Sequence, residues 1–223
     1  MDELKRDFLV GQLKSAYLKF KNYSYYDNYS ALNRCKIAEF EVKNKINNND
    51  NYFQNLAKIL LDENKREELF EEQIDGLDVI CYPKSMNNGT DINFLGNIPI
   101  NSNTVDKVHY FLNIDIVSHI LGVLWIIRDG WVLDDRLYKN CHGNRINKDV
   151  INRIKENKNY NDLTPFLFEP YFKKYQTWRD EAINSVEKLL EQKDNAIMFS
   201  LDFKNYYYSS TIDFIAQQLI SKK

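Results

Sequence analysis

A short, mostly apolar run near the C-terminal end of the sequence, residues 196–201, is followed by the carboxylate Asp202. A run of this length and composition is typical of a strand buried in a sheet. A carboxylate at the end of an interior strand lies where α/β sheets usually bind a ligand. It ionises there only if cations or hydrogen bonds replace its lost hydration. The run therefore predicts a sheet strand, with Asp202 as a candidate ligand of a divalent cation such as Mg²⁺.

Carboxylates in this sequence also have purely structural explanations. A strand-end aspartate can cap the helix that follows or accept N–H bonds in a turn, and residues 210–213 have the pattern of a helix N-terminus. Capping therefore stays open for Asp202. For Asp134 and Asp135 we favour a solvated turn over a metal pair, because adjacent side chains on a regular element diverge.

Helical periodicity dominates the remainder of the chain. It predicts helices over residues 2–20 and 32–46, and a third that starts at residue 53 and becomes acidic from 62 to 75. The most apolar segment, residues 114–127, is too short to span a bilayer and predicts a core helix. Only 7 glycines and 4 prolines in 223 residues argue against an all-β sandwich. We expect a predominantly helical α+β fold.

A β-hairpin is predicted after Gly76. Residues 79–82 have strand composition and end at Pro83, residues 87–89 (Asn-Asn-Gly) are a turn signal, and residues 92–100 can return as the partner strand.

The net charge limits where a nucleic acid could bind, and the cysteine content indicates the redox compartment. A net charge of −2 means that any nucleic-acid-binding surface must be local. Three cysteines without a CxxC spacing and three histidines form no zinc-ligand pattern, so reduced cytosolic thiols are the simplest account. The first seven residues are too charged for a signal peptide. We expect a cytoplasmic protein without a membrane partner.

The best candidate for a phosphate-facing surface is the stretch 138–160, which holds six Lys or Arg against two acidic residues and has a tyrosine at each end. It includes Lys148 and Arg153. Gly143 allows a positive φ or a close approach of the backbone to a ligand. Arg145 offers a planar fork that suits phosphate. The alternative is an exposed lysine-rich helix without a partner.

Three stretches resemble motifs of reverse transcriptases, in the same order along the chain. Residues 201–207 (Leu-Asp-Phe-Lys-Asn-Tyr-Tyr) resemble motif A, the palm strand with the first catalytic aspartate. Residues 141–146 (Cys-His-Gly-Asn-Arg-Ile) resemble a glycine-and-arginine motif of the fingers. Residues 168–180 resemble the segment that joins fingers to palm in bacterial defence-type, abortive-infection-like enzymes. The resemblance covers roughly residues 78–213.

The resemblance implies an RNA-directed DNA polymerase, with an RNA template, a DNA primer and deoxynucleotides as partners and antiviral defence as its setting. The implied organisation is an N-terminal helical region (1–75), reverse-transcriptase-like fingers (76–194) and an incomplete palm with only its first βα unit (195–223). No Tyr-x-Asp-Asp motif occurs in the sequence. We therefore expect the N-terminal portion of a polymerase, whose activity needs the remainder.

The resemblance also assigns roles to single residues. Asp202 would be catalytic and would ligate two Mg²⁺ ions, with the backbone carbonyl of Phe203 ligating one. Tyr207 matches the bulky gate that disfavours a ribose 2′-hydroxyl. Arg145 and Lys84 would hold the triphosphate, although the predicted return strand of the hairpin lacks the usual arginine.

Two alternatives of other classes remain. One is a non-catalytic nucleic-acid-binding module that retains the fingers fold. The other is a helical protein-interaction scaffold in which Asp202 is a cap.

Overall fold

The computed structural model describes residues 2–26, 31–46, 51–86, 105–157, 166–192 and 195–201, together with Gln217. The chain divides into two compact units, Met1–Lys174 and Tyr175–Lys223. The described residues are mostly helical and contain one two-stranded antiparallel sheet, which confirms the α+β class at this coarse level. The fingers-and-palm organisation and the boundaries at 75/76 and 194/195 stay predictions.

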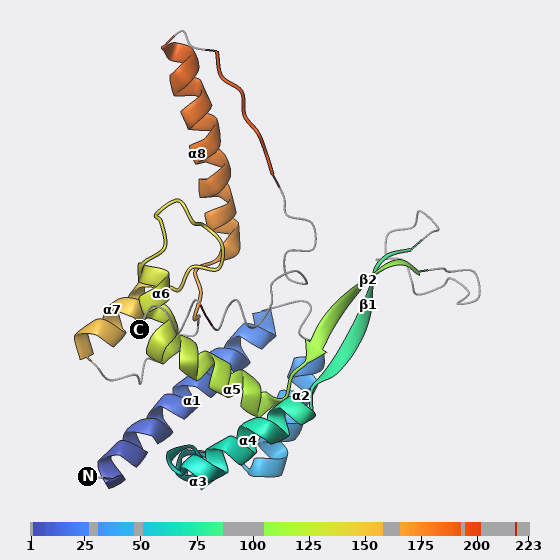
Figure 1. Ribbon diagram of the computed structural model, residues 1–223, viewed down its shortest axis with the longest axis vertical. Helices are drawn as coiled ribbons and strands as arrows, with labels where there is room; N and C mark the ends of the chain where they lie inside the picture. Colours follow the sequence, from blue (N-terminus) through green and yellow to red (C-terminus); the bar gives the residue numbers. More distant parts are fainter. Residues whose placement is uncertain are drawn as a thin grey trace. The chain divides into compact units, whose positions relative to one another are not determined.

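The elements follow one another along the chain as labelled in Figure 1. They are α1 (Asp2–Tyr26), α2 (Ala31–Asn44), α3 (Asn51–Leu61), α4 (Glu63–Asp75), β1 (Asp78–Met86), β2 (Val105–Asn113), α5 (Ile116–Trp125), the π-helical turn η4 (Ile126–Gly130), α6 (Trp131–Asp135), α7 (Lys148–Asn157) and α8 (Tyr171–Glu191).

The helix α1 is the centre of the first unit and packs against α2, α3 and α5. Leu4 and Phe8, which share the helical spacing of the predicted apolar residues, are exposed. The buried apolar residues at that spacing are Leu9, Leu13, Ala16, Tyr17 and Phe20. This spacing places them on one side of the helix, where they form the core with apolar residues of the three neighbouring helices.

The third predicted helix is in fact two helices, α3 and α4, and Asp62 separates them. The backbone of Asp62 is extended, and its side chain accepts a hydrogen bond from the N–H of Lys65 (3.2 Å). This bond satisfies one of the free N–H groups at the start of α4, so Asp62 is its N-cap.

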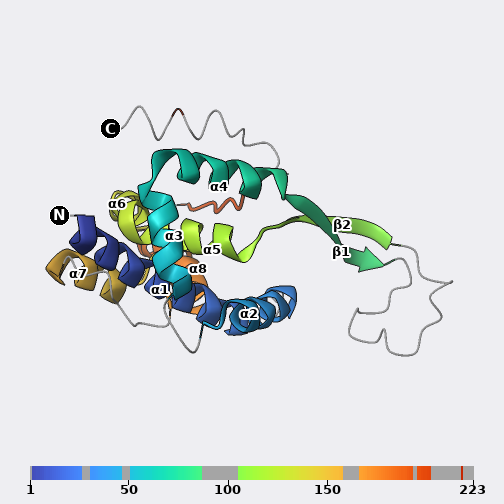
Figure 2. The ribbon, with the colours of Figure 1, turned by 90° about the horizontal axis from the view of Figure 1, so that it is seen from below.

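The predicted hairpin is present, but its return strand lies later in the sequence than predicted. β1 pairs with β2, and Cys81 lies opposite Tyr110, whereas the expected partner, residues 92–100, lies outside the described residues. β1 also continues through Pro83 to Met86, with irregular pairing on both sides of Ser85. Proline is tolerated because β1 is an edge strand. Figure 2 shows the two strands continuing beyond the neighbouring helices of this unit.

The apolar segment 114–127 forms α5, with Ile116, Ile120 and Leu124 buried, which agrees with the predicted core helix. The helical path continues without a break through η4 and α6. By length and composition alone, the stretch Ile116–Asp135 could cross a membrane, a criterion that core helices of soluble proteins also meet.

The prediction of a buried strand over residues 196–201 is wrong for this structure. These residues form neither helix nor strand, and the side chains of Ile197, Phe199 and Leu201 are largely exposed. A strand is stable only when a neighbouring strand satisfies its backbone and another layer covers its apolar face. The described residues of the second unit, in α8 and 195–201, supply no such strand.

We predict that stability falls with acid through His119, which lies on α5 and stacks on Phe20 of α1 with ring centroids 4.3 Å apart. Burial, helped by the charge of Lys36, lowers the pKa of His119 to about 4, while Asp115 opposes this shift. The folded state therefore favours the neutral form of His119 over the protonated form. Stability is complete above the unfolded pKa of roughly 6.5 and is lost as the pH falls towards 4.

Between pH 7 and pH 5 the loss should be about 2 kcal/mol. Urea unfolding at both pH values, followed by circular dichroism, measures it. His119→Phe should remove most of the difference and keep the stacking. An unchanged pH dependence in this variant would assign the loss to other groups.

Candidate nucleic-acid interface

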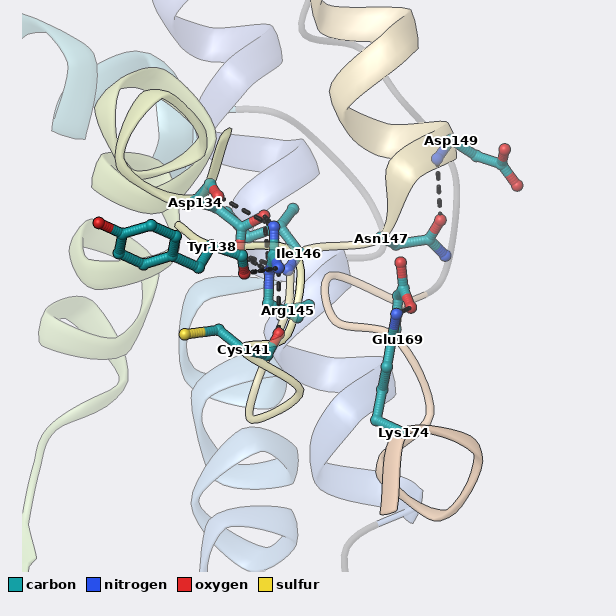
Figure 3. A network of polar contacts seen from close by, with 9 residues as sticks. All are labelled: Asp134, Tyr138, Cys141, Arg145, Ile146, Asn147, Asp149, Glu169 and Lys174. Carbon is teal, nitrogen blue, oxygen red and sulfur yellow. Dashed lines mark hydrogen bonds and ion pairs between the residues drawn. The ribbon is translucent and has the colours of Figure 1, made fainter. Parts of the chain in front are cut away.

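The loop between α6 and α7 is built around a buried ion pair between Asp134 and Arg145 (Figure 3). The Nε of Arg145 donates to Oδ1 (3.1 Å) and Oδ2 (3.2 Å) of Asp134, and Nη2 donates to Oδ2 (3.1 Å). The backbone N–H of Ile146 donates to Oδ1 (3.1 Å). The two side chains are only 9% and 16% exposed. The prediction of a solvated turn at Asp134 is therefore wrong, because a cation eleven residues later compensates its burial.

The other N–H groups of Arg145 bind the loop itself. Nη1 donates to the carbonyl oxygens of Cys141 (3.0 Å) and Tyr138 (3.4 Å), and Nη2 also donates to the carbonyl of Asp134 (3.0 Å). A guanidinium has five N–H donors, and these contacts are enough to occupy all five. The hydrogen bond to Asp134 raises the pKa of Arg145, so its charge is permanent. The contact of Arg145 with a triphosphate stays a prediction, and it would require Arg145 to leave these acceptors.

The residues after Arg145 dock on the segment before α8. Ile146 forms a β-bridge with Phe168, the N–H of Asn147 donates to the carbonyl of Leu167 (2.9 Å), and the N–H of Glu169 donates to the carbonyl of Arg145 (2.8 Å). This pairing connects the predicted fingers motif directly to the predicted fingers-to-palm segment.

The docked segment carries aromatic rings that meet the end of α1. Tyr26 lies against Phe166 with ring centroids 5.1 Å apart, and Tyr23 meets Phe168 edge-on at 6.4 Å. Tyr26 is 73% exposed. Because Phe168 pairs with Ile146, these rings lie near residues 146–147 of the loop, although they are far from it in sequence. Only the tertiary fold brings them there, so no sequence pattern could have indicated them.

The helix α7 carries the two predicted phosphate contacts. Asn147 caps it by accepting the N–H of Asp149 (3.0 Å), as Figure 3 shows, and Val150 is buried. Lys148 and Arg153 are both exposed. Five residues correspond to a rotation of about 140° around a helix, so these side chains point to different sides of α7.

Gly143 does not have the left-handed backbone that the sequence allowed. Its φ lies outside that region, and a Cβ added there would meet no atom within 4 Å. The left-handed residue is its neighbour Asn144, with φ 44°, a conformation that asparagine tolerates. No contact within the described chain explains the glycine. A close approach of its backbone to a ligand stays a prediction.

The remaining predicted site residues are not brought to this loop by the described structure. Lys84 lies in β1 beside the irregular pairing. Asp202, Phe203 and Tyr207 lie outside the described residues. Within the described ranges, no group of three or more His, Cys, Asp or Glu could hold a metal ion. The Mg²⁺ site therefore stays a prediction.

The structure also contains an open groove of about 360 Å³ that no sequence pattern indicated. Its lining comes from α2, from the end of α4 and from the base of the hairpin, and comprises Lys36, Glu72, Gln73, Gly76, Asn113 and Asp115. The ammonium of Lys36 donates to the side chain of Asn113 and to the carbonyl of Ile114. This lysine thus binds the hairpin base to α2.

Comparison with protein-family models, with curated proteins and with solved structures finds no match to this chain.

Replacing Arg145 with Ala is expected to lower the free energy of unfolding by about 3 kcal/mol, because it leaves the carboxylate of Asp134 buried without its cation. Urea unfolding at pH 7 measures the change. Arg136→Ala is the matched control, since Arg136 is exposed on the same loop, and it should cost less than about 0.5 kcal/mol. An equal loss of unfolding free energy in the two variants would show that the burial of Asp134 does not depend on its ion pair with Arg145.

Proposed function

We propose that this chain is the N-terminal portion of an RNA-directed DNA polymerase of the bacterial defence type, acting in the cytoplasm. The support is the order of three stretches that resemble reverse-transcriptase motifs, at residues 141–146, 168–180 and 201–207. The pairing of Ile146 with Phe168 adds a structural link, because it joins the first two stretches.

The geometry best supports binding of single-stranded nucleic acid by the first unit. The observation that carries this part of the proposal is the docking of the loop on residues 166–169. This docking connects the exposed ring pair of Tyr26 and Phe166 to the loop that leads into α7, the helix of Lys148 and Arg153. Proteins that bind single strands combine a basic groove for the backbone with aromatic rings on which bases stack. The ion pair between Asp134 and Arg145 holds the loop in place, so Arg145 acts here as a positioning residue.

The proposed chemistry is phosphoryl transfer, in which bound Mg²⁺ would supply electrostatic stabilisation of the developing charge. Asp202 and the carbonyl of Phe203 offer the oxygen ligands that Mg²⁺ prefers. One carboxylate cannot assemble a two-metal site. The other carboxylates would come from a remaining part of the palm. Tyr207 would crowd a ribose 2′-hydroxyl and so favour deoxynucleotides.

Asp202→Ala is expected to abolish DNA synthesis on an RNA template while leaving the fold intact, since it removes the shared metal ligand. The measurement is primer extension by a polypeptide that contains this chain together with the rest of the palm. Asp180→Ala is the control, because Asp180 is an exposed aspartate on α8 that pairs with Arg179. Primer extension that survives in the Asp202 variant would dismiss the polymerase assignment.

Replacing both Lys148 and Arg153 with Ala is expected to weaken binding of a single-stranded oligonucleotide and to reduce its salt dependence. Each lost phosphate contact should lower the slope of log K against log salt by about 0.7. Fluorescence anisotropy of a labelled oligonucleotide measures both effects. The control removes two exposed lysines elsewhere, Lys58 on α3 and Lys65 on α4.

Gly143→Ala provides a separate test of the same surface. Its stability should stay within about 0.5 kcal/mol of the parent, because the added methyl group meets no atom of the chain. Oligonucleotide binding should weaken if the backbone of Gly143 approaches the bound nucleic acid. Binding that depends equally on the control lysines would argue against this interface.

The two alternatives give different results in these experiments. A non-catalytic module would bind the oligonucleotide through Lys148 and Arg153 but show no primer extension. A helical scaffold would show neither.

A further inference from the structure

The helix α4 exposes an apolar stripe to solvent. Phe70, Ile74 and Leu77 are 43%, 65% and 43% exposed. The spacing of four residues places Phe70 and Ile74 on one side of α4, and Leu77 follows directly after the C-cap Gly76. The neighbouring side of α4 already has its partners, since Leu69 packs against the core and Gln73 accepts a hydrogen bond from Ser118 of α5 (2.7 Å). The stripe is therefore a second face of the helix, apart from the one that holds it to the protein.

Carboxylates flank one side of this stripe, because Glu67 and Glu71 lie on the side of α4 next to Phe70 and Ile74. The segment from residue 67 to residue 75 contains five acidic residues and no Lys or Arg, and the acidic residues are Glu67, Glu68, Glu71, Glu72 and Asp75. All five are exposed. The ion pairs of α4 lie at its start, between Lys65 and Asp62 and between Arg66 and Glu63. In the part of the chain that the structure describes, no basic group pairs with any of the five.

This arrangement destabilises α4 when nothing covers it. Glu67 and Glu71 are four residues apart, as are Glu71 and Asp75, and like charges at this spacing repel each other. The last turn of the helix contains no basic residue, so the negative end of the helix dipole adds to the repulsion. Cations placed along the stripe would remove both costs.

We propose that this face of α4 docks a basic amphipathic helix of a partner protein. The three apolar side chains would pack against the apolar side of that helix, and its Lys and Arg residues would lie against the flanking carboxylates. Charge excludes the other obvious occupants. A nucleic acid would bring phosphates to the carboxylates, and a second copy of α4 would bring further carboxylates. The inference is independent of the polymerase proposal.

The test uses the full chain and a labelled synthetic peptide of Leu and Lys, about 15 residues long, whose leucines follow helical spacing. Fluorescence anisotropy measures its affinity. A peptide of the same composition in scrambled order, which has no apolar side, should bind at least tenfold more weakly. Equal affinity of the two peptides would overturn the proposal, because it would show attraction by charge alone.

Two variants locate the surface. Ile74→Asp should weaken binding of the helical peptide by about tenfold, because it places a charge in the centre of the stripe. Ile74 is exposed enough for this change to leave folding intact. The matched control is Val42→Asp on α2, since Val42 is 80% exposed, and it should bind like the parent. Equal effects of the two substitutions, or none from Ile74→Asp, would overturn the proposal.

A charge variant separates docking from a merely structural role. Replacing Glu67 and Glu71 with Gln should weaken peptide binding by about tenfold and at the same time raise the melting temperature of the free chain, because it removes a repulsion. A lower melting temperature would show that these carboxylates stabilise the fold and would overturn the argument. Self-association of the parent chain that Ile74→Asp abolishes would also overturn it, in favour of a second copy as the occupant.

Discussion

Asp134 is a carboxylate in the protein interior, and its burial obliges the chain to bring a cation to it. Arg145 is that cation, and its guanidinium has more N–H groups than one carboxylate needs. The remaining N–H groups donate to the carbonyls of Tyr138 and Cys141, so the cation that neutralises Asp134 also gives the loop its shape. The shaped loop then pairs with the segment before α8 through Ile146. Through this pairing, one ion pair connects the loop that leads into α7 with the segment that carries Phe166 and Phe168.

Elements that depend on local pattern could be predicted from the sequence. The core helix α5 follows from a run of apolar residues, and the buried side of α1 follows from a spacing of three and four. Elements that depend on a partner elsewhere could not. The return strand of the hairpin was misplaced, because residues 92–100 and Val105–Asn113 are both plausible strands and only pairing chooses between them. Residues 196–201 have strand composition, but composition supplies no neighbouring strand.

The candidate site shows the same division. The sequence identified the basic stretch and its glycine, because charge runs and glycines are visible without a fold. It assigned Arg145 to a phosphate and Asp134 to solvent, since each residue was judged from its neighbours in sequence. The structure pairs the two across eleven residues. A left-handed backbone was one of two roles considered for Gly143, and the left-handed residue of this loop is Asn144, because the path of the loop, which Arg145 determines, decides which residue turns.

The π-helical turn η4 lies between the apolar helix α5 and the short helix α6 that carries Asp134. Its wider hydrogen bonds accommodate an additional residue in the helical path. The wide turn takes up this residue locally, so α6 presents its side chains at nearly the angle that an uninterrupted α-helix would give them. Deleting the residue would convert η4 into an ordinary α-helical turn and leave the carboxylate of Asp134 facing Arg145. The ion pair that shapes the loop therefore tolerates a one-residue change in helix length at this turn.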